Sequence, residues 1–112
     1  MINSREKGKK GELEIAKKLR EYGFDTRRSQ QFNGKEGEAD VVGPPGIHIE
    51  VKRVEALNID NALKQSIRDC KGNNIPAVFH RRNGEKWKVT LDFDDFMKIY
   101  GEYYSSMILK EV

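Results

Sequence analysis

The sequence predicts an α/β fold in which a mixed central β-sheet is flanked by α-helices. Three observations predict it: an amphipathic stretch over about 3–22, two strand-like stretches joined by a turn over 38–53, and a strand–helix–strand pattern over about 47–80. A chain of 112 residues suffices for one two-layer core but not for a separate substrate domain, so we expect residues 1–112 to form a single domain.

The first predicted helix carries an acidic residue on its packing side. Asn3 or Ser4 can act as its N-cap, and its apolar residues recur at helical spacing: Leu13, Ile15, Ala16, Leu19 and Tyr22. Glu12 lies one to two turns before Ile15, Ala16 and Leu19, so it projects from the same side. A carboxylate there needs a partner, such as a bound cation or a facing lysine; the alternative is that Glu12 lies at the edge and reaches water.

The stretch 38–53 has three charged residues where a buried strand should be apolar. In its second half, apolar residues alternate with His48, Glu50 and Lys52. Since a strand repeats every two residues, Glu50 and Lys52 lie side by side on one face. The Gly-Pro-Pro-Gly segment at 43–46 favours a turn that brings Asp40 towards Glu50. Two carboxylates then converge beside one lysine.

Two carboxylates and a lysine suit a hard divalent cation. Mg²⁺ takes oxygen ligands, usually one or two carboxylates together with substrate phosphate oxygens. Asp40 and Glu50 can supply them, the carbonyl of Val51 is a further candidate ligand, and Mn²⁺ is an alternative ion. Lys52 could orient or deprotonate a water, or stabilise charge on a phosphate. The pattern predicts a metal-dependent site for phosphodiester cleavage; the alternative is a solvated strand face with an ion pair.

A polar loop separates this hairpin from a first strand expected over 24–29. It runs from Ser29 to Gly37 and contains one aromatic residue, Phe32. Such a loop can hold a substrate backbone or stack Phe32 on an exposed base. The alternative is an ordinary surface connection.

The second half of the chain completes the predicted sheet. A helix over about 59–70 should begin after Asn58 or Asp60 and lead to a strand over 75–80. Its hairpin partner is expected over 87–91, because Asn83-Gly84 is a strong turn signal.

The chain ends in an apolar segment. Asp92 should cap a third helix. Large apolar residues continue to the end of the chain: Phe93, Phe96, Met97, Tyr100, Tyr103, Tyr104, Met107, Ile108 and Leu109. So many need cover, which either the protein's own sheet or a second subunit could provide.

The cysteine and the histidines give no sign of a metal site of their own. The single cysteine, Cys70, excludes an intrachain disulfide and a zinc cluster of several thiolates, and we expect it to be a small buried hydrophobe. His48 and His80 lack metal-ligand spacing, and we expect strand surface or core positions for both.

The charge distribution is typical of a protein that binds a polyanion. The chain has 21 Lys and Arg against 18 Asp and Glu, a net charge of +3 and a pI of about 9.0. The basic residues expected to contact phosphates are Lys9, Lys10, Arg27, Arg28 and Lys35. No apolar run approaches the ~20 residues of a membrane span. The first residues lack a secretory leader, so we expect a cytoplasmic protein.

The order of these residues resembles the PD-(D/E)xK nuclease superfamily, and most closely its Holliday-junction resolvase branch of archaea and phages. The resemblance spans roughly Arg5 to His80 and implies a restriction-endonuclease-like fold. It implies that Glu12, Asp40 and Glu50 bind Mg²⁺ and that Lys52 assists the attacking water. The family's loop serine and helix glutamine would correspond to Ser29 and Gln65. Ala39 stands where the family's name has proline, a residue that is often missing.

The resemblance implies a Mg²⁺-dependent endonuclease for branched DNA in recombination or repair. We expect a homodimer, because resolving a two-fold related junction needs two nicks. One alternative is another nicking or restriction-like nuclease, and a second is a DNA-binding module with a vestigial site.

Overall fold

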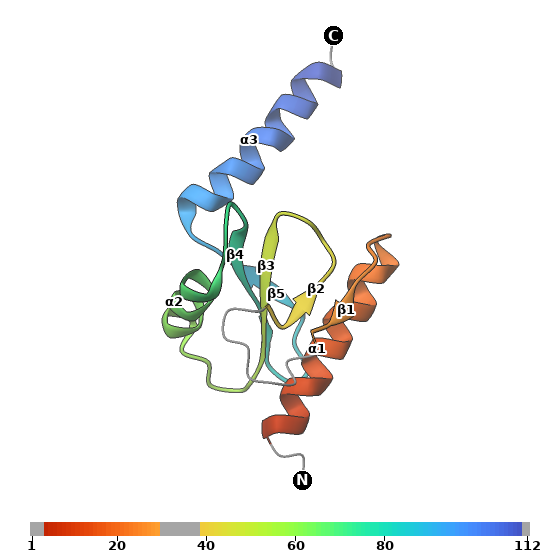
Figure 1. The fold of residues 1–112 in the computed structure, drawn as a ribbon, viewed down its shortest axis with the longest axis vertical. Helices are drawn as coiled ribbons and strands as arrows, with labels where there is room; N and C mark the ends of the chain where they lie inside the picture. Colours follow the sequence, from red (N-terminus) through yellow and green to blue (C-terminus); the bar gives the residue numbers. More distant parts are fainter. Residues whose placement is uncertain (1–3, 30–38, 111–112) are drawn as a thin grey trace.

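The computed structural model describes residues 4–29 and 39–110 of the chain. In chain order its elements are α1 (Ser4–Glu21), β1 (Arg27–Arg28), β2 (Val41–Val42), β3 (Ile47–Arg53), α2 (Ile59–Asp69), β4 (Ile75–Arg81), β5 (Lys88–Thr90) and α3 (Phe93–Lys110) (Figure 1).

The five strands form one mixed sheet in the order β1-β2-β3-β4-β5. β3 and β4 run parallel, whereas every other neighbouring pair is antiparallel. α2 makes the crossover that two parallel strands require, and the side chain of Asn58 caps it by accepting from the amide of Asn61. The predicted α/β fold with a mixed sheet flanked by helices is confirmed.

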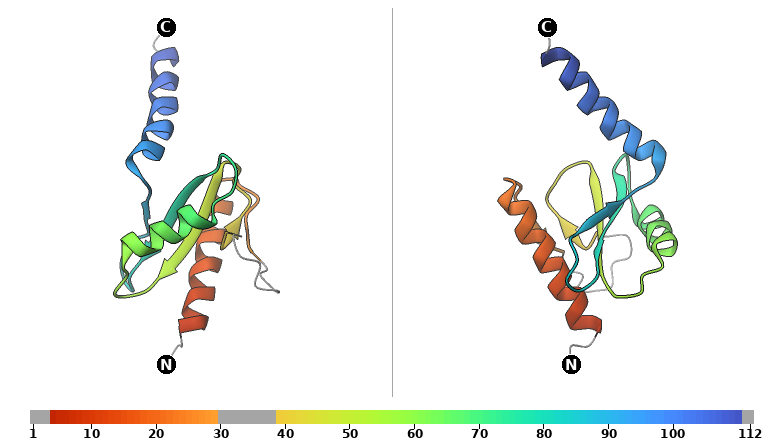
Figure 2. Two further views of the ribbon diagram at one scale, coloured as in Figure 1. Left: turned by 60° about the vertical axis from the view of Figure 1, so that its left-hand side comes forward. Right: turned by 180° about the vertical axis from the view of Figure 1, so that it is seen from behind.

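α1 and α2 lie on opposite sides of the sheet (Figures 1 and 2). On the α1 side, Ile15 and Ala16 pack against Val41, Ile49 and Val51 to form the buried core. Side chains alternate along β3, so His48, Glu50 and Lys52 point to the α2 side. There Ala62 and Ser66 of α2 are buried, and the Ser66 hydroxyl donates to the carbonyl of Ala77 in β4. His48, Glu50 and Lys52 therefore lie on the α2 side of the sheet, whereas Arg53 pairs with Glu14 of α1 on the other side.

The turn between β2 and β3 is pressed against the chain that enters β1. Gly43 has a φ of +134°, and a Cβ at this position would lie 2.1 Å from the carbonyl oxygen of Asp25. Only glycine fits there. The strand predicted over 24–29 is restricted to Arg27–Arg28, because its partner β2 is itself two residues long.

Cys70 differs from its expected position in the core. It is half-buried at the end of α2, and its thiol donates to the carbonyl of Asn74 at 3.1 Å. α2 ends at Asp69 and Cys70 is its C-cap, so the side chain lies past the helix face that packs on the sheet, and the charge of Asp95 in α3 acts on its thiol.

α3 stands apart from the rest of the molecule (Figures 1 and 2). It has no buried residue, although large apolar side chains occupy more than half of its positions. The sheet therefore does not provide the cover that we considered for this segment. No helix in the described part of the chain is long and apolar enough to cross a membrane.

Candidate active site

Asp40 is held at the start of β2 by contacts with two neighbouring segments. Its amide donates to the carbonyl of Ile49 at 2.9 Å, and its Oδ2 accepts from the amide of Val51 at 2.8 Å. The amide of Ser29 donates to the carbonyl of Asp40 at 2.9 Å. These bonds point the Asp40 carboxyl group towards β3, close enough to Glu50 for the charge of Glu50 to act on it.

Glu50 lies at the centre of β3 and is almost completely buried. Its side chain is 3% exposed and that of His48 is 5% exposed, and His48 Nε2 lies 2.8 Å from Glu50 Oε1. Sequence reasoning assigned His48 no role, but the structure places it against a candidate catalytic carboxylate. The sequence could have indicated this contact, because His48 and Glu50 are two residues apart on one strand and therefore share a face.

The carboxyl group of Asp40 is difficult to ionise in this position. Burial, and next the charge of Glu50, raises the pKa of Asp40 from 3.8 to about 8, and the charge of Glu12 acts in the same direction. The charges of Glu50 and of Glu12 therefore both act on the carboxyl group of Asp40.

Glu12 reaches this cluster from α1. It forms an ion pair with Arg28 of β1, and its side chain is 17% exposed. The alternative that Glu12 lies at the edge and simply reaches water does not hold. Its partner is an arginine 16 residues away, in place of the cation or lysine that we considered.

Lys52 and Val51 occupy the end of β3 next to the acids. Lys52 is half-buried and lies on the same face as Glu50. The N–H and C=O groups of one strand residue point to the same side, so the carbonyl of Val51 faces the side from which Asp40 approaches.

The donor set fits a hard cation, although its oxygens have protein partners in this structure. Among the described residues, no three His, Cys, Asp or Glu side chains are arranged to hold a metal ion. Asp40 is bonded to Val51, Glu50 to His48 and Glu12 to Arg28. Burial, and next the charge of Glu50, raises the pKa of Asp40, and a bound divalent cation would offset that charge.

The candidate DNA-binding residues occupy several elements around this cluster. Lys9, Lys10 and Arg27 are exposed, whereas Arg28 is half-buried against Glu12. Ser29 is buried, and its hydroxyl has no hydrogen-bond partner within the described ranges. Gln65 lies half-buried on α2. Lys35 and the loop with Phe32 lie outside the described residues.

Comparisons with known proteins agree on a nuclease fold. A family model described as "Phage putative PDDEXK endonuclease" matches residues 3–111. The chain is also similar to the solved structure of Hjc from Archaeoglobus fulgidus, described as a Holliday junction resolvase from an archaeal hyperthermophile. The identity is 22% and the TM-score 0.58, over 76% of this chain and 72% of that one. No curated protein matches.

Proposed function

We propose that this protein, which belongs to the phage PDDEXK endonuclease family, hydrolyses phosphodiester bonds of DNA with the aid of Mg²⁺. Family membership makes it an endonuclease, and its restriction-endonuclease-like fold agrees with that. The observation that carries the proposal is the carboxyl pair formed by Asp40 and Glu50 on adjacent strands.

Each residue of the site would have a separate role. Asp40, Glu50 and Glu12, with the carbonyl of Val51, would hold Mg²⁺ or Mn²⁺, which when bound offsets charge on the phosphate and makes water more acidic. Asp40 must lose its proton to become a ligand, so we expect cation affinity to rise as the pH approaches 8. Lys52 would orient the attacking water or stabilise charge on the phosphate.

DNA would be held by basic side chains around this site. The residues that we propose as phosphate contacts are Lys9, Lys10, Arg27, Arg28 and Lys35, with Ser29 and Gln65 as polar contacts. Arg28 already pairs with Glu12, so it is placed to link the DNA backbone to the acidic cluster.

We further propose that the substrate is a four-way junction and that the enzyme is a homodimer. The fold is similar to that of a protein described as a Holliday junction resolvase. A junction is two-fold related, and a two-fold dimer would present two equivalent sites to it.

α3 supplies the surface for such a dimer. At 100° per residue, one half of this helix carries Phe93, Phe96, Met97, Ile99, Tyr100, Tyr103, Tyr104, Met107 and Ile108. These side chains are between 42% and 74% exposed, whereas Asp94, Lys98 and Glu102 occupy the other half. A standard interface buries roughly 800 Å² per partner, which the apolar half of α3 and adjoining surface could provide.

The experiment that tests the function compares cleavage of a synthetic four-way junction and a linear duplex of the same sequence. We expect paired nicks in the junction with Mg²⁺, little cleavage of the duplex, and none in either with a chelator. Asp40→Asn should be inactive, and Asp94→Asn, an exposed acid on α3, is the matched control. Equal cleavage of both DNAs would favour another nicking or restriction-like nuclease. Absence of cleavage would favour a DNA-binding module with a vestigial site.

A further inference from the structure

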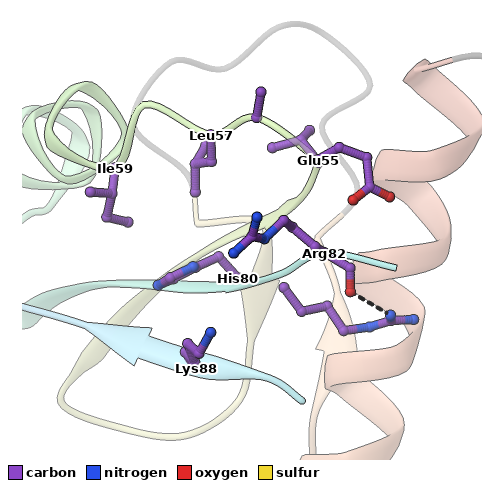
Figure 3. A pocket seen from close by; sticks show the side chains of 9 residues that line it. Glu55, Leu57, Ile59, His80, Arg82 and Lys88 are labelled. Atoms are coloured by element: carbon purple, nitrogen blue, oxygen red, sulfur yellow. Dashed lines mark hydrogen bonds between the residues drawn. The ribbon is translucent and has the colours of Figure 1, made fainter. Parts of the chain in front are cut away.

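A cavity of about 490 Å³ lies at the carboxyl ends of β3 and β4, and none of the proposed catalytic residues lines it. Its lining residues are Val54, Glu55, Ala56, Leu57, Ile59, His80, Arg81, Arg82 and Lys88 (Figure 3). Ligands of open α/β sheets bind at this end of parallel strands. The volume falls within the range of roughly 300–1,000 Å³ for small-molecule sites. The position and the volume of the cavity both suit a ligand the size of a small molecule.

The lining has an apolar side and a basic side. Leu57, before α2, and Ile59, its first residue, lie opposite His80 and Lys88 of β4 and β5 (Figure 3). Arg82 lies between them, with Glu55 farther towards α1. An apolar wall suits the flat face of an unstacked base, whereas an arginine and a lysine suit a phosphate. The two halves of a nucleotide match the two sides of the cavity.

The cavity adjoins the candidate active site across the sheet. His80 is the register partner of Lys52, and neighbouring strands lie about 4.8 Å apart. Register partners share a face, so the surface that carries Glu50 and Lys52 continues directly to His80. A group in the cavity and a phosphate at Lys52 could therefore belong to one DNA strand.

Two of the basic side chains in the cavity can change partner at low cost. Arg81 is engaged by Glu14 through bonds of 3.1 and 2.9 Å. Arg82 and Lys88 pair with Glu85 at 2.7 and 3.7 Å, and their side chains are 60% and 61% exposed. Exposed ion pairs contribute little to stability. A phosphate can therefore replace Glu85.

We propose that this cavity binds one unstacked nucleotide of the DNA strand whose phosphate occupies the active site. The base lies against Leu57 and Ile59, and its phosphate contacts Lys88 and Arg82. This inference rests on the proposed function. It would explain why the enzyme prefers branched DNA to a continuous duplex. A base within a continuous duplex must leave the stack to enter, whereas an unpaired base at a branch enters at lower cost.

The test is a binding measurement that needs no cleavage. In the Asp40→Asn background, fluorescence anisotropy compares a linear duplex with the same duplex carrying a short unpaired bulge. We expect the parent to prefer the bulged DNA. Leu57→Ser and the pair Arg82→Gln with Lys88→Gln should each weaken bulge binding about tenfold, the scale of one lost base contact, and affect the duplex less. Lys71→Gln combined with Lys98→Gln, two exposed lysines outside the cavity, is the charge-matched control for the pair.

Two further variants sharpen this test. Glu85→Gln removes the acid that competes for Arg82 and Lys88, so it should tighten binding of the bulged DNA. Leu57 is half-buried, so its variant is compared with the parent by thermal melting. The Arg82 and Lys88 pair, being exposed, tests the cavity independently of folding.

Two results would overturn the inference: equal losses on both DNAs, or no loss on either. The proposed function is tested apart from it. If the wild type resolves junctions while the cavity variants bind normally, only the cavity assignment fails. If the wild type cleaves nothing while bulge-selective binding depends on the cavity, the nuclease proposal fails and the cavity assignment stands.

Discussion

The sheet around β3 and the helix α3 depart from ordinary packing in opposite directions. In β3, charged and polar side chains are buried: that of Glu50 is 3% exposed and that of His48 is 5% exposed. In α3, apolar side chains are exposed, and Phe93 reaches 74%. A buried carboxylate needs a partner, and an exposed apolar face needs cover. This contrast is why we propose the catalytic site on the sheet and the dimer contact on α3.

The largest effect should come from the buried acids. Asp40→Asn or Glu50→Gln should lower the cleavage rate by about 10²–10³-fold, the scale of losing one electrostatic catalytic group, because each removes a carboxylate that we propose to hold the cation. DNA affinity should change little. Without metal, the melting temperature should stay equal or rise, because the variants relieve repulsion between carboxylates. Wild-type cleavage rates in either variant would remove the site assignment.

Variants of α3 should disrupt the proposed dimer without unfolding the sheet. Tyr100→Glu combined with Met107→Glu should turn a dimer into a monomer, because both residues lie on the apolar half of α3. The melting temperature of the sheet should hardly change, since α3 has no buried residue. Sedimentation equilibrium at micromolar concentration measures this, with Lys98→Glu as the control. A single wild-type species near 12.9 kDa that junction DNA leaves unchanged would contradict the dimer.

His48 should have a smaller effect than the acids themselves. His48→Leu removes the hydrogen-bond partner of the Glu50 carboxylate, and changes of this kind typically cost about 10–100-fold in metal affinity or activity. His48→Gln keeps an N–H donor and should recover part of the loss. Single-turnover cleavage across a Mg²⁺ titration distinguishes weaker metal binding from a slower reaction. Full activity of the leucine variant would show that the contact is incidental.

The raised pKa of Asp40 predicts how stability depends on pH. In the folded protein this carboxyl group holds its proton up to about pH 8, whereas its ordinary pKa is 3.8. The folded state thus binds more protons between these values, and the free energy of unfolding should fall as pH rises through that window. Melting curves without metal should show this slope in the wild type and a shallower one in Asp40→Asn. Identical slopes would contradict the raised pKa.

The smallest effect should come from single basic residues outside the acidic cluster. Lys9→Gln, Lys10→Gln and Arg27→Gln should each flatten the salt dependence of DNA binding by about one unit of log–log slope. Lys18→Gln, an exposed lysine farther along α1, is the control. Unchanged slopes for all three variants would place the DNA footprint elsewhere.

Features set by local sequence could be predicted from the chain alone. The spacing of Ile15, Ala16 and Leu19 indicates α1, and the 43–46 turn with the alternation along β3 indicates the hairpin. Because the side-chain period of a strand is two, the shared face of Glu50 and Lys52 follows directly.

Features set by packing between distant segments could not be predicted. The ion pair of Glu12 with Arg28 depends on where β1 lies along α1. His48 is buried because α2 crosses its side of the sheet, and the cavity exists because the segment after β3 meets β4 and β5. The sequence shows that α3 is apolar on one side, but not that the sheet leaves that side uncovered.

The central claim is that Asp40 and Glu50 bind a divalent cation at this site. Its most direct test is a Mn²⁺ titration followed by electron paramagnetic resonance, in which free Mn²⁺ gives the signal and bound Mn²⁺ does not. The wild type and the Asp40→Asn, Glu50→Gln double variant are compared with and without junction DNA. We predict that the wild type removes Mn²⁺ signal, more strongly as the pH approaches 8, and that the double variant does not. Equal Mn²⁺ binding by the two proteins would contradict the claim.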